Sequence, residues 1–283
     1  MRSSEGGRSG GTAVAAGAPP IRSHEFRRLQ HLLYAVSGIQ LRAGKEALVR
    51  SRMAGRLHAC GTRTFREYLD LVESGDGTEL RELIDALATN KTEFFREAAH
   101  FDFLKSDLLP MWRRVQHPLR IWCAGCSTGE EPLSIGMLLA EEMSPDRARA
   151  ARILATDVSS RSIDRARRGL YSPRSLGVLS LERRRRFFRR TQRSGRWRVR
   201  PELAAMVRFA RLNLMHEWPM RGRFDLIVCR NVMIYFDAPV RQRLIERFWE
   251  RTTAGGYLFV GHSESLGALS HGFRYVRPAI YVR

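Results

Sequence analysis

The chain has 283 residues and a mass of 32.5 kDa, enough for one large or two ordinary domains, and 28% of its residues are charged. No apolar run approaches the roughly 20 residues of a membrane span, and no secretory signal opens the sequence. Four cysteines in a chain this long do not form a disulfide framework. Composition therefore predicts a soluble, cytoplasmic protein without membrane insertion.

Arginine supplies nearly all of the positive charge of the chain. Lys+Arg is 49 against 29 acids, which gives a net charge of +20, and only Lys45, Lys91 and Lys105 are lysines. Such a surplus predicts long-range attraction to something acidic, either nucleic acid or an acidic protein surface. Genome composition accounts for part of an arginine bias, and a solvated basic face without any partner is the alternative.

The first third of the chain predicts a disordered leader followed by helices. Residues 1–20 are rich in Gly, Ser, Ala and Pro and lack periodicity. Residues 21–95 show helical spacing and predict a small N-terminal all-α domain. Thr64, with Glu67 three positions later, is a capping box that predicts a helix start. The apolar positions of the first, second and fourth predicted helices are Phe26, Leu29, Leu33, Val36; Val49, Met53, Leu57; and Leu80, Leu83, Ile84, Leu87.

Residues 96–283 change to strands that alternate with helices, which predicts an α/β fold with a doubly wound, mostly parallel sheet. Asp237 and Pro239 predict the start of one helix, and Gly255-Gly256 its end. Two short runs, Phe187–Gln192 and Trp197–Val199, flank Ser194-Gly195 and predict a small antiparallel β insertion at about 185–202. The predicted strands are 119–124, 152–158, 206–210, 224–229, 257–260 and one or two in 273–282; the predicted helices are 96–115, 132–143, 159–169 and 237–251.

Ligands of such sheets bind beyond the carboxyl ends of the strands. The first strand ends in a loop, residues 125–131, in which Gly125 lets the backbone approach a ligand closely. Glu130 and Glu131 then begin the next helix, where they would repel a phosphate and suit a cationic amino group. This favours S-adenosylmethionine over a dinucleotide, although acids near a helix start also simply stabilise it.

Three further strand ends carry polar residues. Asp157 ends the second strand, where an acid can accept both ribose hydroxyls. Asn213-Leu214 and Arg230-Asn231 each follow another strand, and an Asn side chain both donates and accepts hydrogen bonds. That capacity suits an adenine edge or the amino-acid end of the cofactor.

Five ordered segments strongly resemble the chemotaxis receptor methyltransferase (CheR) family. They are ATNKTEFFRE (Ala88–Glu97), RIWCAGCSTGEEPLSIGMLL, ATDVSSRSIDRARRGLYS, FDLIVCRNVMIYFD and GGYLFVGHSESL. The resemblance covers the chain from about Phe26 to its end. It implies a class I, Rossmann-like methyltransferase fold and S-adenosylmethionine-dependent protein-glutamate O-methylation of chemoreceptor cytoplasmic helices, with S-adenosylhomocysteine as product.

The same resemblance implies the site residues. Arg96 and Tyr235 correspond to residues that lie near the transferred methyl group in the family, and the basic helix that touches the receptor corresponds to Lys45, Arg52 and Arg56. Two departures from the family pattern are Leu133 in place of a usual Tyr and Gly125 in place of a common Ala. The expected cofactor-binding residues are Asn90, Thr92, Arg96, Gly125, Glu130, Glu131, Asp157, Asn213, Leu214, Arg230 and Asn231.

Other interpretations stay open. Cys123 and Cys126 form a C-x-x-C, but no second pair or His cluster accompanies them, so packing is favoured over a metal or redox site. The +20 charge leaves a nucleic-acid methyltransferase as one alternative, and a non-catalytic signalling scaffold as another. We expect a chemoreceptor as partner, no nucleic acid, no metal, and a monomer, with a dimer not excluded.

Overall fold

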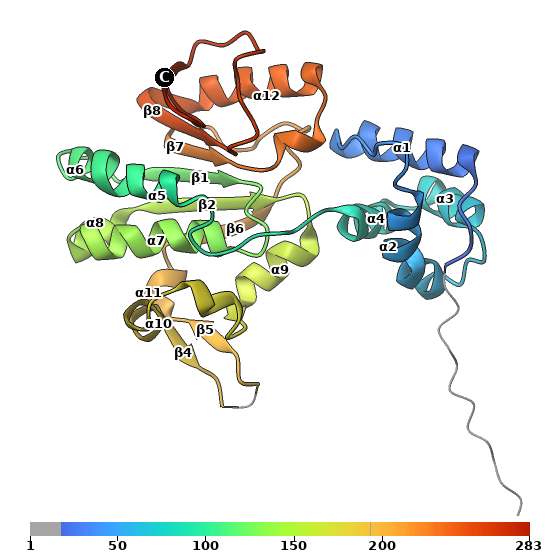
Figure 1. The fold of residues 1–283 in the computed structure, drawn as a ribbon, viewed down its shortest axis with the longest axis horizontal. Coiled ribbons are helices and arrows are strands. Elements are labelled where there is room, and N and C mark those ends of the chain that lie inside the picture. Colours follow the sequence, from blue (N-terminus) through green and yellow to red (C-terminus); the bar gives the residue numbers. More distant parts are fainter. Residues whose placement is uncertain (1–17, 193) are drawn as a thin grey trace, which may run out of the picture. The chain divides into compact units, whose positions relative to one another are not determined.

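The computed structural model describes residues 18–192 and 194–283 (Figure 1), so the predicted leader lies outside the described residues except for its last three. The chain forms two compact units. One extends to Leu29 and resumes over residues 42–87, and the other holds residues 30–41 and 88–283. Helix α1 (Ser23–Ser37) contributes to both units. Among the described helices, none has the length and hydropathy needed to cross a membrane.

The first unit is helical, as its periodicity predicts. It contains α2 (Glu46–Ala59), α3 (Phe65–Ser74) and α4 (Thr78–Leu87). Helix α3 begins where the capping box predicts, because the Thr64 hydroxyl accepts the Glu67 N–H at 3.2 Å. The return bond is shifted by one residue, since the Glu67 carboxylate accepts the N–H of Arg63 at 2.8 Å. The predicted apolar positions Val49, Met53 and Leu57 are all buried.

The second unit is built on a seven-stranded sheet with the order β6-β2-β1-β7-β8-β10-β9. The first five of these strands are parallel, β10 is antiparallel to β8, and β9 is antiparallel to β10. The predicted doubly wound, mostly parallel sheet is therefore confirmed. The strands are β1 (Arg120–Ala124), β2 (Arg152–Asp157), β6 (Val207–Arg211), β7 (Phe224–Cys229), β8 (Thr252–Val260), β9 (Arg274–Arg277) and β10 (Ile280–Val282).

Alternation along β1 divides the core into two layers. Ile121 and Cys123 pack in the layer that includes α7 (Glu130–Glu142), whereas Trp122 and Ala124 pack in the layer that includes α12 (Ala238–Arg251). From β1 the chain proceeds through α7, α8 (Pro145–Ala150), β2 and α9 (Ser160–Arg168) toward one edge of the sheet. From β7 it proceeds toward the other edge. The carboxyl ends of β1 and β7 therefore flank the crevice where such sheets bind ligands.

The single helix predicted at 96–115 is wrong. The structure has α5 (Ala98–Phe103), a π-helical turn (Leu104–Leu108) and α6 (Leu109–Trp112). Pro110 lacks the N–H that would bond the Ser106 carbonyl, and the regular helix is interrupted one turn before it. The helix starts two residues late because Phe95 and Glu97 have φ angles of 54° and 59°.

Two further predictions need correction. Gly255 and Gly256 do not end α12, which stops at Arg251; they lie inside β8, where Gly255 has φ +75° and the pairing with β7 shifts register. A bulge of this kind needs the left-handed backbone that glycine provides. Phe187 ends α10 (Leu181–Phe187) instead of beginning a strand of the insertion.

The small antiparallel insertion itself is confirmed. It has the order β3-β5-β4, formed by β3 (Leu170–Tyr171), β4 (Phe188–Arg190) and β5 (Trp197–Val199). Strand β3, helix α10, helix α11 (Pro201–Ala204) and a 3-10 turn (Ser175–Val178) were not predicted, because each is too short to show a period.

Candidate functional site

The loop after β1 is held tightly against its neighbours. The N–H groups of Gly125 and Cys126 both donate to the Thr156 carbonyl, at 2.8 and 2.9 Å. Gly125 has φ +97°, and a Cβ there would lie 2.3 Å from Val232 Cγ2. Asp157 faces the same loop and accepts the N–H of Ser127 at 2.8 Å and that of Ser159 at 2.9 Å. This arrangement fixes the orientation of the Asp157 carboxylate beside the loop after β1.

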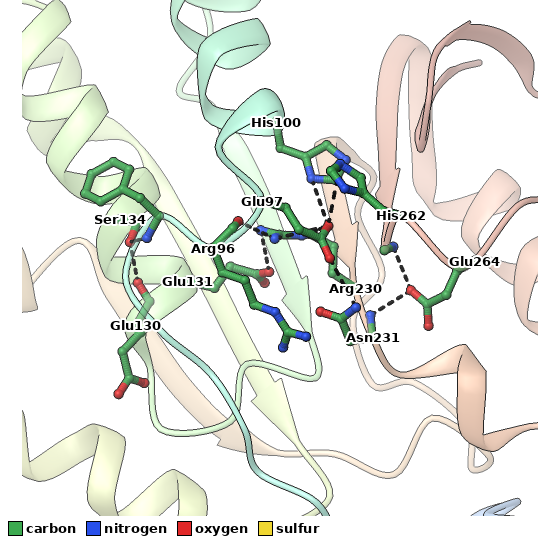
Figure 2. A network of polar contacts seen from close by, with 12 residues as sticks. Arg96, Glu97, His100, Glu130, Glu131, Ser134, Arg230, Asn231, His262 and Glu264 are labelled. Atoms are coloured by element: carbon green, nitrogen blue, oxygen red, sulfur yellow. Dashed lines mark hydrogen bonds and ion pairs between the residues drawn. The ribbon is translucent and has the colours of Figure 1, made fainter. Parts of the chain in front are cut away.

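Arg230 is the centre of the polar network at the carboxyl end of β7 (Figure 2). Its side chain is 3% exposed and forms ion pairs of 3.3 Å with both Glu97 and Glu131. It also donates to the Arg96 carbonyl. Asn231 extends the network, because its amide donates to Glu97 at 3.2 Å. One guanidinium thus joins the segment before α5, the first turn of α7 and the end of β7.

The two carboxylates paired with Arg230 differ in protonation. Burial alone would raise the pKa of Glu97, but the adjacent His100 ring, the Arg230 charge and the Asn231 amide together lower it to about 2. Burial raises the pKa of Glu131 to about 7 in spite of the Arg230 charge. At neutral pH Glu97 is therefore ionised beside Arg230, whereas Glu131 is about half protonated, so that a further cation beside it would favour its ionised form.

Glu264 connects the loops that follow β7 and β8. It is 3% exposed, and its carboxylate accepts the N–H groups of Asn231, Ile234 and Gly261 at 2.6, 3.1 and 2.6 Å. Burial raises its pKa even though these backbone donors act in the opposite direction. Asn231 itself has φ 59°, an unusual conformation that the Glu264 contact helps to hold.

Replacing Gly261 with Ala is expected to disturb the hydrogen bonds that the Glu264 carboxylate accepts from the backbone. The added Cβ would lie 2.5 Å from Glu264 Oε2 and 2.9 Å from the Asn231 backbone nitrogen. We expect the free energy of unfolding to fall by about 1–3 kcal/mol, with weaker cofactor binding, measured by urea denaturation and calorimetry. The matched control is Gly267→Ala, whose Cβ would meet only the Ser265 hydroxyl at 3.5 Å. Equal stability and equal cofactor affinity of the two variants would contradict a role for the Glu264 hydrogen bonds in holding the site.

Two histidines lie beside the Glu97 carboxylate. His100 is buried, stacks on Phe259 with ring centroids 5.1 Å apart, and has Nδ1 3.4 Å from the Glu97 carboxylate. Burial lowers its pKa. His262 is half exposed, with Nε2 4.0 Å from the same carboxylate. Their ligand atoms and that of Glu97 lie within 4.8 Å of one another, but Arg230 already neutralises Glu97, so a metal cation there would be opposed by its charge.

Glu97, His100, His262 and Glu264 were missed by the sequence reasoning. Glu97 directly follows Arg96, His100 stands three positions after Glu97, and His262 and Glu264 stand in the segment GHSES after β8. Only their position beside recognised motifs could have suggested them. Cys123, Cys126 and Cys229 are buried, and burial raises their thiol pKa values well above the usual range, which supports the packing interpretation of the C-x-x-C.

The predicted cofactor residues fall into connected and peripheral groups. Asn90 joins the connected group through its carbonyl, which accepts the Ser127 hydroxyl at 3.1 Å. Glu130 is buried and accepts the Thr128 hydroxyl at 2.7 Å, and Figure 2 shows its carboxylate directed away from Arg230. The connected residues form two sets: Asn90, Gly125 and Asp157 at the loop after β1, and Arg96, Glu131, Arg230 and Asn231 in the Arg230 network.

The remaining predicted residues lie near strand ends or are partly exposed. Asn213 follows β6 and accepts the Met215 N–H at 3.0 Å, and Leu214 is buried beside it. Tyr235 ends a 3-10 turn (Met233–Tyr235) a few residues after Asn231. Thr92 is partly exposed in the segment before α5. Their roles stay predictions.

Both parts of the chain match one protein family. Residues 90–282 match the CheR methyltransferase, SAM binding domain, and residues 24–88 match the CheR methyltransferase, all-alpha domain. The chain belongs to the CheR methyltransferase family. Its cofactor is S-adenosylmethionine, and the close backbone approach at Gly125, the aligned Asp157 carboxylate and the poised Glu131 fit a ligand with a ribose and an ammonium group.

Curated relatives of this CheR-family chain are chemotaxis enzymes. It is 39% identical to the chemotaxis protein methyltransferase of Borreliella burgdorferi, covering 92% of this chain and 94% of that protein. The corresponding protein of Klebsiella aerogenes is 39% identical, covering 97% and 95%. That of Escherichia coli is also 39% identical, covering 90% and 89%. The chain is therefore a methyltransferase of the chemotaxis class.

The three basic residues expected to contact the receptor differ in availability. Arg56 is bound within the helical unit by Glu79 and by Glu82, the latter at 3.4 Å. Arg52 donates to the Leu87 carbonyl at 2.6 Å. Lys45 is exposed immediately before α2. The arginines of this CheR-family helix thus stabilise their own unit, and Lys45 is the most accessible of the three.

Proposed function

We propose that this protein methylates glutamate side chains of chemoreceptor cytoplasmic helices, in the cytoplasm and as a monomer. The observation that carries the proposal is the Arg230 network, because it joins three of the segments that resemble the family into one site. The net charge of +20 supports an acidic protein as partner.

The reaction requires little acid–base catalysis from the protein. S-adenosylmethionine supplies an electrophilic methyl group, and a glutamate side chain is already ionised at pH 7. Neither a general base nor strong stabilisation of the carboxylate is needed, since its charge is consumed in the transition state. The contribution of the protein is alignment of two held partners.

We assign this alignment to Arg96. Its guanidinium donates to the Lys91 carbonyl at 2.9 Å, a contact within its own segment. Figure 2 shows this guanidinium extending away from Glu97 and His100, while the Arg96 carbonyl meets Arg230. The side chain is therefore held outside the Arg230 network, where it can orient cofactor or substrate, with Tyr235 as a second guide.

Replacing Arg96 with Ala is expected to lower the methyl-transfer rate about tenfold or more, because alignment is lost. Transfer to receptor-containing membranes measures it, and circular dichroism checks the fold. Arg114→Ala is the control, since Arg114 is exposed beyond α6. Unchanged turnover in the Arg96 variant would remove its catalytic role.

The product distinguishes the proposed function from the nucleic-acid alternative. The protein is incubated with methyl-labelled cofactor and with membranes and nucleic acid from its own source. Label released as methanol by mild alkali indicates a carboxyl methyl ester, which we expect. Alkali-stable label on nucleic acid would overturn the proposal, and cofactor binding without any transfer would indicate a scaffold.

A further inference from the structure

A cavity lies at the opposite end of the sheet from the cofactor site. Its volume is about 600 Å³, and it is lined by residues of α7, α8, α10 and α11 and of the approach to β6. Helix α8 leads directly into β2, and Met206 immediately precedes β6. The cavity therefore adjoins the amino ends of β2 and β6, whereas Asp157 stands at the carboxyl end of β2.

The cavity combines an apolar floor with a cationic rim. Phe187, Leu203 and Met206 form buried parts of its lining. Four arginines from three segments line the same space, together with the acid Glu202. They are Arg149, Arg185, Arg186 and Arg200.

Two of these arginines have unused binding capacity. Among the described residues, neither Arg185 nor Arg200 makes a side-chain hydrogen bond or ion pair, and both are exposed. Arg186 donates to the Ala140 carbonyl at 2.7 Å and lies 5.1 Å from the Phe187 ring centre. Arg149 pairs with Asp146 at 2.5 Å. The rim thus carries more positive charge than its carboxylates neutralise, which concentrates anions at the cavity.

We infer that this cavity is a nucleotide-binding site, separate from the cofactor pocket. Its volume lies in the range of about 300–1,000 Å³ that is typical of small-ligand sites. Guanidinium groups bind phosphate oxygens in bidentate geometry and also stack on planar rings. A base and sugar would cover the apolar floor while the phosphates meet Arg185 and Arg200. Inorganic phosphate alone would leave the floor uncovered.

Calorimetry on the full chain tests the inference, with GTP as the probe and saturating S-adenosylhomocysteine to fill the cofactor pocket. We expect GTP to bind the wild type, and the Arg185→Ala/Arg200→Ala variant to bind it at least tenfold more weakly. The matched control is Arg221→Ala/Arg223→Ala, which removes the same charge from exposed positions outside the cavity. Its GTP affinity is expected to stay within about twofold of wild type.

A second variant tests the cavity without altering charge. Ala205→Trp places a bulky ring in the lining and keeps every arginine, so it should also abolish GTP binding. Equal loss in the control variant would show general attraction to a basic protein and overturn the inference. So would GTP affinity no higher than that of inorganic phosphate or of a glutamate-rich peptide, which would indicate a plain anion site or a protein-docking surface.

Discussion

Replacing Arg230 with Gln is expected to weaken S-adenosylmethionine binding by about 100-fold or more, because removing one partner of a buried ion pair costs about 3–5 kcal/mol. The variant leaves Glu97 and Glu131 side by side without their shared cation. It also frees the Arg96 carbonyl and with it the segment before α5. The free energy of unfolding should fall with the affinity, and calorimetry and urea denaturation measure the two effects.

Arg113→Gln is the matched control for the Arg230 variant. Arg113 pairs with Glu142 at 3.2 Å, but its side chain is half exposed, and pairs of this kind contribute about 0–1 kcal/mol. We expect little change in stability and none in cofactor affinity. If the Arg230 variant bound the cofactor as tightly as Arg113→Gln does, the Arg230 network would not be needed to shape the cofactor site.

Glu131 is expected to make stability and cofactor binding depend on pH near neutrality. Its folded-state pKa of about 7 exceeds the ordinary value of 4.5, so the folded protein binds more protons than the unfolded chain between these values. Stability from this group is full below pH 4.5 and declines by about 3 kcal/mol as pH rises to 7. Glu97, with a pKa of about 2, acts oppositely: its contribution is present above pH 4.5 and is lost toward pH 2.

A cofactor ammonium that pairs with ionised Glu131 should displace its proton. Below pH 7 the affinity for S-adenosylmethionine is then expected to fall, approaching tenfold per pH unit. Calorimetry in two buffers of different ionisation enthalpy detects the released proton. Glu131→Gln should bind weakly at every pH and release none. A pH-independent affinity in the wild type would separate Glu131 from the ammonium.

The regular parts of the fold were predictable because their signals are local. The capping residues of α3, the apolar runs of β1 and β7 and the strand–helix alternation each lie within a few neighbouring positions. The double glycine inside β8 misled for the same reason: glycine occurs at helix ends and in β-bulges alike, and only the pairing with β7 distinguishes the two.

The site was predictable in its parts but not in its connections. Gly125, Asp157 and Asn231 stand at strand ends, where the sheet topology alone suggests a ligand. The contact of Glu97 with Arg230 depends on a left-handed backbone at Glu97 and on residues far apart in sequence. The burial that separates the pKa values of Glu97 and Glu131 is likewise a property of the packed molecule, so no sequence spacing reports it.

The burial of three cysteines limits how readily this protein is oxidised. Thiolates, not thiols, react with peroxides, and the three buried groups at Cys123, Cys126 and Cys229 are held protonated and away from solvent. The end of β1 and the loop after it therefore carry a C-x-x-C without becoming a target for peroxide. Methyl transfer by this protein would then continue while more exposed thiols are being modified.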